Sequence, residues 1–263
     1  LRLDALVVGS DQVWNVRFFA DAEGKYNPLF FLHGMARGVR RIAYAVSVGR
    51  GGWDSYKWKD ELQEDVRAFD ACSVRESFAR DELLGLGVRA PCVPDPTLLI
   101  PQEVYDGIAP RRKVSPYVFA YLLTERNAVA DICAAAQEAL SCPVRSVALN
   151  LKDSRTSLVP SPRRWLGLLR EARFVVTDSF HGVALSVAFN VPFAALLKSN
   201  EPGPNARICE LLDRLGLSDR IVAPMDVRPD LFQKPIDWGS VNEKAELFRQ
   251  SGVLFLGEAL HGE

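Results

Sequence analysis

Short apolar runs alternate with longer amphipathic stretches along most of the chain. The runs have the length of buried strands, and the stretches between them carry apolar residues at helical spacing. The predicted strands are residues 5–9, 40–47, 70–74, 88–93, 117–123, 144–149, 173–176 and 194–197. The predicted helices are residues 60–69, 78–86, 128–140, 164–171, 206–215 and 240–252, together with one that begins at Gly182 and stops before Pro192. Strands that alternate with helices indicate parallel α/β units, so we predict an α/β fold with parallel sheets.

The alternation lapses between residues 101 and 116, around the basic stretch PRRK that begins at Pro110. We interpret this segment as a linker and predict an N-terminal domain over residues 1–112 and a C-terminal domain over residues 113–263. The length of 263 residues suits two domains. The chain opens at Leu1 and runs almost at once into a predicted strand, so we expect it to be a fragment of a longer protein.

Composition narrows the class of protein. The chain is 48% hydrophobic and 25% charged, which is ordinary for a soluble globular protein, and its net charge of -1 argues against a nucleic-acid partner. The five cysteines form no C-x-x-C pair, so they predict neither disulfides nor a zinc site and are typical of a reduced, cytoplasmic protein. No apolar run reaches the length of a membrane span. The sequence leaves open whether the protein associates with a membrane surface and whether it forms a homo-oligomer.

A polar turn separates the apolar run 173–176 from the apolar helical pattern that follows it. In a parallel α/β sheet such a turn lies at the carboxyl end of the strand, where ligands bind, and the helix N-terminus favours anions. The turn carries Thr177, Asp178, Ser179 and His181, the last of which is one of only three histidines. Asp178 is placed to orient or charge the imidazole. A purely structural histidine is the alternative.

Two cations also follow predicted strands. Lys198 ends the next strand, at the same sheet edge as His181, and Arg75 ends a strand in the first half of the chain. We therefore predict an anion-accepting cleft between the two domains, with Arg75 facing His181 across it. The alternatives are a solvated lysine and a surface ion pair of Arg75 with Glu76 or Asp81.

Several familiar catalytic motifs are missing from the sequence. Ser179 is not in a G-x-S-x-G elbow, because Thr177 takes the place of the first glycine. The chain contains no phosphate-binding G-x-x-x-x-G-K-[ST], no dinucleotide-binding G-x-G-x-x-G and no H-E-x-x-H metal motif. We accordingly expect no metal and no bound cofactor.

Five stretches together resemble one family, the polysaccharide pyruvyl transferases. They are residues 8–15 (VGSDQVWN), 42–49 (IAYAVSVG), 73–77 (SVRES), 93–99 (VPDPTLL) and 175–182 (VVTDSFHG). Their order and spacing hold from about residue 3 to residue 217, and the set is far more specific than any one motif. The resemblance implies a glycosyltransferase-B-like pair of Rossmann-type domains whose sheets face a cleft. It also implies transfer of the pyruvyl group of phosphoenolpyruvate to a sugar, or to a lipid-linked glycan, as a ketal.

The resemblance assigns roles to individual residues. His181, Arg75 and Lys198 fall where the family binds its donor, with His181 as acid or phosphate ligand and the two cations as anion clamps. The resemblance also assigns Ser179 to donor binding, and it assigns Asp178 to catalysis together with His181 and Arg75. The acceptor side is expected at Ser10, Asp11, Gln12, Trp14 and Asn15, although this segment also fits a well-capped turn.

The family's first βα unit, which carries the carboxylate proposed as base, is expected to precede Leu1. The base is therefore unassigned, and Asp11 and Asp178 are substitutes for it unless they only cap turns. Two further readings remain: a nucleotide-sugar-dependent glycosyltransferase of the same architecture, and a glycan-binding relative without turnover.

Overall fold

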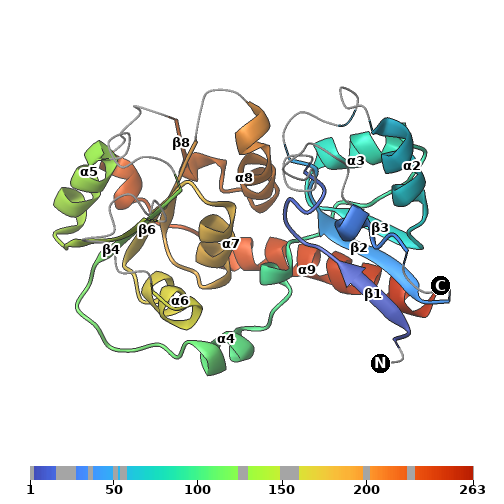
Figure 1. Ribbon diagram of the computed structural model, residues 1–263. Helices are drawn as coiled ribbons and strands as arrows, with labels where there is room; N and C mark the ends of the chain where they lie inside the picture. The colour runs from blue at the N-terminus through green and yellow to red at the C-terminus, as the bar shows by residue number, and fades with distance from the viewer. Residues whose placement is uncertain are drawn as a thin grey trace. The chain divides into compact units, whose positions relative to one another are not determined.

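The computed structural model describes residues 3–15, 28–34, 38–49, 53, 58–123, 130–148, 160–197, 202–223 and 229–262. The chain divides into two compact units (Figure 1). The first comprises Leu1–Leu99 together with Glu246–Glu263, and the second comprises Ile100–Ala245. Each unit contains a parallel sheet with helices packed on it, which confirms the predicted α/β class. No helix among these described residues is both long enough and apolar enough to span a membrane.

The first unit has a three-stranded sheet in the order β1-β2-β3. Its elements are β1 (Ala5–Val8), β2 (Arg40–Val46), α2 (Lys59–Arg67), β3 (Ala71–Val74), α3 (Ser77–Gly85), two 3-10 turns, η1 (Pro28–Phe31) and η2 (Pro96–Leu98), and the end of α9 (Trp238–His261). Helices α2 and α3 cover one face of the sheet and α9 runs along the other (Figure 1). Alternate side chains of β2 supply both contacts: Ala43 packs under α2 and α3, while Ile42 and Tyr44 pack against α9.

The second unit has a five-stranded sheet in the order β5-β4-β6-β7-β8. Its strands are β4 (Val118–Leu122), β5 (Val144–Ala148), β6 (Phe174–Thr177), β7 (Phe193–Leu196) and β8 (Ile221–Val222). Its helices are α4 (Gln102–Ile108), α5 (Ala130–Leu140), α6 (Pro162–Arg170), α7 (Phe180–Ala188) and α8 (Pro202–Leu215), followed by the 3-10 turns η5 (Ser218–Arg220) and η6 (Pro229–Phe232). The inner strands β4 and β6 are almost wholly buried, as parallel strands covered on both faces are.

Several predicted elements differ from the structure for identifiable reasons. The predicted strand 88–93 is reduced to one bridge between Val74 and Cys92, because Pro91 has no N–H to extend the ladder. The predicted linker 101–116 contains the helix α4, which is held by the buried Tyr105. Asn205, predicted to cap a helix, lies inside α8, which begins at Pro202.

The final helix also accounts for a difference in the division of the chain. Residues 240–252 were predicted as a helix of the C-terminal domain, whereas α9 spans Trp238–His261 and its last part belongs to the first unit. Phe255 and Ala259 pack there with the β2 residue Tyr44, whose ring centroid lies 6.2 Å from that of Phe255. The units therefore divide at residues 99 and 245 rather than at residue 112 alone.

Candidate functional site

The turn between β6 and α7 is fixed by the hydroxyls of Thr177 and Ser179. Thr177 Oγ1 donates to the Tyr121 carbonyl of β4 (2.7 Å) and accepts the Ser179 N–H (3.1 Å). Ser179, in an extended conformation, caps α7, and its Oγ accepts the Gly182 N–H at 3.4 Å. The first turn of α7 is thereby anchored at the carboxyl end of the sheet in the second unit.

Gly182 allows α7 to approach the strand closely. A Cβ atom at this position would lie 3.0 Å from both Cβ and Cγ2 of Thr177 and closer still to Thr177 Oγ1. Any larger residue would push the helix away from the strand end. The glycine in the VVTDSFHG stretch is thus required by packing within the turn.

His181 is the polar side chain of α7 that solvent reaches. Every residue of this helix is buried except His181 and Ala188, which are partly exposed. The imidazole lies in the first turn, with its ring edge-on to that of Phe180 at 5.6 Å between centroids. A partly exposed histidine beside the positive end of a helix dipole is well placed to meet an anion.

Asp178 does not form the predicted partnership with His181. The residue is 2% exposed, and its Oδ1 accepts the Leu123 N–H at 2.6 Å. Within the described ranges no hydrogen bond or ion pair joins it to His181, and its second oxygen, Oδ2, is buried without a hydrogen-bond partner. Burial, and secondarily the charge of Asp178, raises the pKa of the Tyr121 phenol. Asp178 thus ties the end of β4 to the β6–α7 turn, and Lys198 lies outside the described residues.

A second polar cluster, in the first unit, surrounds Arg75 directly after β3. The Arg75 side chain is only 2% exposed. Its Nη1 donates to Asp95 Oδ2 at 2.8 Å, and its Nη2 donates to Asp11 Oδ1 at 2.6 Å. Glu76, one of the partners considered from the sequence, is more distant, with Oε2 3.9 Å from Arg75 Nε, and Asp81 pairs with Arg80 instead.

Asp95 is the buried anchor of this cluster, and the sequence analysis did not identify it. Its carboxylate is 1% exposed. Besides Arg75, Oδ2 accepts the Ser10 hydroxyl at 2.8 Å, while Oδ1 accepts the Thr97 N–H at 3.0 Å and the Thr97 hydroxyl at 2.8 Å. The signal was the stretch VPDPTLL, in which Asp95 caps the turn η2.

The loop that carries Asp11 is held on both sides. The Asp11 carbonyl accepts the Ser47 N–H at 2.9 Å, and the Trp14 N–H donates to the Ser47 carbonyl at 3.3 Å. Asn15 donates its side-chain N–H to Gln12 Oε1 at 2.7 Å. Trp14 and Asn15, both expected on the acceptor side, are buried and serve to fix the loop.

Asp11 differs from the rest of its cluster in exposure. Its side chain is 50% exposed, whereas those of its partner Arg75 and of Asp95 are almost fully buried. No group of three or more His, Cys, Asp or Glu side chains within the described part of the chain is arranged to hold a metal ion. The cluster therefore presents one carboxylate, supported by a buried guanidinium, at the carboxyl edge of the three-stranded sheet.

The chain was compared with solved structures, curated sequences and protein-family models. One similar solved structure is UDP-N-acetylglucosamine 2-epimerase from Rickettsia bellii, with 13% identity and a TM-score of 0.44 over 84% of this chain and 68% of that one. A second is the S. aureus MnaA–UDP co-structure, with 10% identity and a TM-score of 0.46 over 95% of this chain and 70% of that one. A third is the wall teichoic acid polymerase TagF, with 10% identity and a TM-score of 0.46 over 90% of this chain and 71% of that one. A comparison with curated protein sequences gave no match. The family model described as polysaccharide pyruvyl transferase matches residues 2–200, and by this match, which spans most of the chain, the protein belongs to that family.

Proposed function

We propose that this chain transfers the pyruvyl group of phosphoenolpyruvate to two hydroxyls of a sugar in a cell-surface glycan or its precursor, leaving a pyruvate ketal and releasing phosphate. The family match supports the reaction class. The observation that carries the site is His181, the one polar side chain of the otherwise buried helix α7 that solvent reaches.

The reaction sets clear demands on the protein. A proton adds to the methylene carbon of phosphoenolpyruvate, which makes the central carbon electrophilic. One sugar hydroxyl then adds to that carbon, and a second displaces phosphate. Of the two protons that the diol loses, one balances the proton gained by carbon and the other leaves with phosphate. The protein must supply an acid, a base and groups that hold the donor's phosphate and carboxylate.

The second unit supplies the groups suited to the donor. The first turn of α7 favours negative charge, and the His181 imidazole can donate a hydrogen bond to phosphate or give up a proton. Ser179 and Asp178 are 3% and 2% exposed, and each already accepts a backbone N–H, from Gly182 and from Leu123 respectively. In our proposal they hold the β6–α7 turn in place beneath His181. Lys198 remains a predicted ligand of the donor.

Arg75, in the first unit, was predicted from the sequence as an anion clamp, but its surroundings favour a different role. Its two Nη atoms are engaged by Asp95 and Asp11, and solvent reaches 2% of the side chain. An anion would reach Arg75 only after displacing Asp11. In our proposal Arg75 is instead a positioning residue, which holds the half-exposed Asp11 carboxylate in place to accept the proton of the acceptor hydroxyl.

The proposal is tested by titrating phosphoenolpyruvate into the chain and by following phosphate release with sugar and lipid-linked acceptors. We expect His181→Ala to weaken donor binding by about 10- to 100-fold, the effect of losing a charge-assisted hydrogen bond. His261→Ala, at the exposed end of α9, is the matched control and should bind as the unmodified chain does.

Three results would overturn parts of this proposal. Full phosphate release by His181→Ala would show that the donor site is elsewhere. Saturable binding of a nucleoside diphosphate in place of phosphoenolpyruvate would favour a glycosyltransferase. Sugar binding without binding of either donor would favour a glycan-binding protein without turnover.

A further inference from the structure

The helix α4 is fixed to the second unit by its inner face. Tyr105 is buried and packs edge-on against Phe189, with 4.9 Å between ring centroids. The buried Arg170 donates to the Ala109 carbonyl at 2.8 Å and forms an ion pair with Asp106. These contacts hold a short helix rigidly against α6 and α7, so the orientation of its outer face is also fixed.

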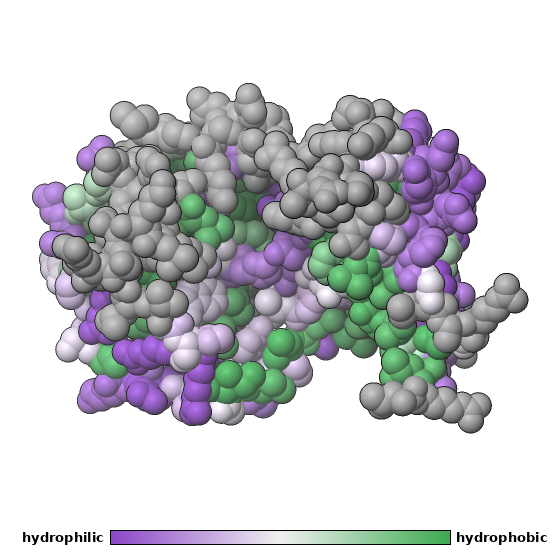
Figure 2. All heavy atoms as spheres, viewed as in Figure 1, coloured by the Kyte–Doolittle hydropathy of each residue, from purple (hydrophilic) through white to green (hydrophobic). Residues whose placement is uncertain are grey.

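That outer face is apolar. Val104 and Ile108, one helical turn apart, are 49% and 42% exposed. Ile100, just before the helix, is 36% exposed, and Val114, just after it, is 37% exposed. The space-filling view shows apolar residues gathered over α4, beside a hydrophilic region (Figure 2). Four large aliphatic side chains are thus exposed within one short segment, and two of them lie one helical turn apart on α4.

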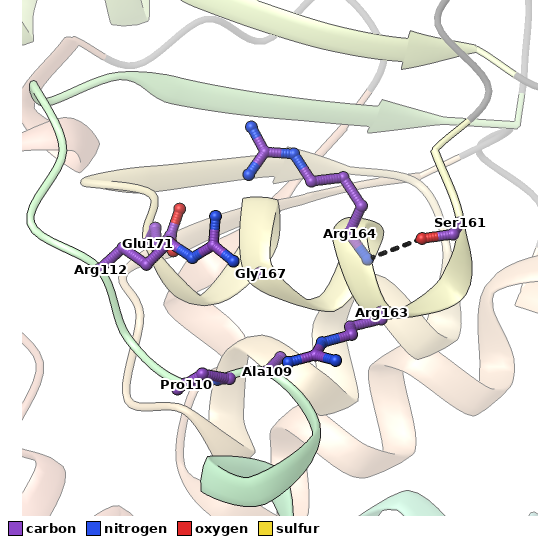
Figure 3. Close-up of a pocket in the computed structure, with 8 residues that line it drawn as sticks. All are labelled: Ala109, Pro110, Arg112, Ser161, Arg163, Arg164, Gly167 and Glu171. Carbon is purple, nitrogen blue, oxygen red and sulfur yellow. Dashed lines mark hydrogen bonds between the residues drawn. The ribbon is translucent and has the colours of Figure 1, made fainter.

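Basic side chains border this apolar surface. Arg111, Arg112 and Lys113 follow α4 directly and are exposed, as is Arg163 in the first turn of α6. Arg112 and Arg163 line one pocket of about 120 Å³, together with Ala109, Pro110, Ser161, Arg164, Gly167 and Glu171. In Figure 3 the guanidinium of Arg163 extends toward Ala109 and Pro110, whereas that of Arg164 points away from them. The pocket thus joins the basic residues to the end of α4.

The acidic residues of the region only partly offset this charge. Asp106 is paired with Arg170. The carboxylates that remain to offset the basic residues are those of the exposed Glu103, on α4, and of Glu171, in the pocket. The segment from Ile100 to Val114, with Arg163, therefore combines an apolar face with an excess of positive charge. The chain as a whole carries a net charge of -1, so the basic residues here are a local concentration.

From this combination we propose that the outer face of α4 docks on an anionic lipid bilayer. Phosphate headgroups attract the arginines and Lys113, and the boundary beneath them accepts Val104 and Ile108. A nucleic acid would satisfy the basic residues but would leave the aliphatic side chains in water. The docking does not depend on the pyruvyl transfer proposed above, although a lipid-linked acceptor would be concentrated at the same surface.

The test is co-sedimentation of the chain with phosphatidylcholine vesicles, with and without phosphatidylglycerol. We expect binding only to the anionic vesicles, and weaker binding as salt increases. Arg112→Gln with Arg163→Gln should lower the partition coefficient by about 25-fold, from about fivefold for each basic residue at an anionic surface. Val104→Ser with Ile108→Ser should also weaken binding but keep its dependence on salt.

The matched control is Arg80→Gln with Arg89→Gln, which removes two exposed arginines from the first unit. The proposal would be overturned by equal binding to neutral and anionic vesicles, or by an equal loss of vesicle binding in the control and in the Arg112/Arg163 variant. It would also be overturned if inorganic phosphate displaced the chain from vesicles more than chloride does at the same ionic strength. The last outcome would identify a site for a free anion instead.

Discussion

Arg75 Nη2 lies 2.6 Å from Asp11 Oδ1, and this ion pair joins a buried guanidinium to a carboxylate that is half exposed. On its other side Arg75 contacts Asp95, which is buried as deeply as the arginine itself. This asymmetry supports the roles proposed above, in which the buried Asp95 supports Arg75, Arg75 positions Asp11, and the half-exposed Asp11 meets the substrate.

The first prediction concerns Asp11. If Asp11 accepts the proton of the acceptor hydroxyl, Asp11→Asn should lower kcat for phosphate release by about 10²- to 10⁴-fold, the usual contribution of a general base. Binding of phosphoenolpyruvate should change by less than about twofold, because the donor is held elsewhere. The measurement is the rate of phosphate release, paired with calorimetric titration of the donor.

The control is Asp81→Asn, which removes a carboxylate from an exposed arginine pair in the same unit. It should leave both quantities unchanged. Tighter donor binding by Asp11→Asn would contradict this assignment, because it would mean that Asp11 competes with the donor's anion for Arg75.

The role of Arg75 gives a separate prediction. As a positioning residue, Arg75→Lys should lower kcat while leaving the affinity for phosphoenolpyruvate nearly unchanged, because lysine keeps the charge but loses the two-sided geometry of the guanidinium. As an anion clamp, the same substitution would instead weaken donor binding. Calorimetric titration and phosphate release, measured on one preparation, separate the two roles.

The two buried members of the cluster, Arg75 and Asp95, lead to a prediction about the free energy of unfolding. Asp95→Ala leaves the Arg75 charge with one fewer carboxylate and leaves the Ser10 and Thr97 donors without their acceptor. We expect a loss of about 3–5 kcal/mol in the free energy of unfolding, measured by urea titration. Adding Arg75→Met to Asp95→Ala should recover part of that loss. A double variant no more stable than Asp95→Ala would show that the buried charge is not the cause.

Local patterns in the sequence were enough to predict the β6–α7 turn. The apolar run and the apolar helical pattern after it lie within a few residues of each other, so a strand and a helix could be predicted there. The helix was expected to begin at Gly182, however, whereas α7 begins at Phe180, with Ser179 as its cap and His181 in its first turn. The pairing of Arg75 with Asp11 and Asp95 was not predictable in this way. The partners lie 64 and 20 residues from Arg75. The parallel register of β1–β3 brings Asp11 to the sheet edge beside Arg75, and the bridge between Val74 and Cys92 brings Asp95 there.

The last part of α9 illustrates the same limit. Its helical pattern was visible, but its contact with Tyr44 joins residues about 200 positions apart, and periodicity carries no information about such a partner. The prediction for Asp178 is the opposite case. Its closeness in sequence suggested a pair with His181, but its carboxylate accepts a hydrogen bond from the backbone N–H of Leu123, at the end of the neighbouring strand.

Gly182 provides a prediction about the packing of α7. Gly182→Ala should destabilise the second unit by about 1–3 kcal/mol, because the added methyl meets the Thr177 side chain, which is itself held by the Tyr121 carbonyl. Gly257→Ala in α9 is the matched control, since a Cβ there meets nothing within 4 Å. That variant should be neutral or more stable by up to about 1 kcal/mol. Equal effects of the two substitutions in urea unfolding would contradict the close approach of α7 to the strand.

The ion pair between His33 and Asp65 predicts how stability depends on pH. His33 Nδ1 lies 2.6 Å from Asp65 Oδ1, and the hydrogen bond and charge of Asp65 raise the pKa of His33 from its ordinary value of 6.5. The folded state therefore binds the proton more tightly than the unfolded state. The stabilisation is fully present below pH 6.5 and is lost as pH rises through the raised folded-state pKa.

His33→Gln should accordingly lower Tm more at about pH 5.5 than at about pH 8.5, where both chains lack the charged pair. The effect will be small, because the imidazole is 58% exposed and solvent screens the pair, and added salt should reduce it further. A difference between the unmodified chain and His33→Gln that grew with rising pH would have the wrong sign for a histidine stabilised in its protonated form.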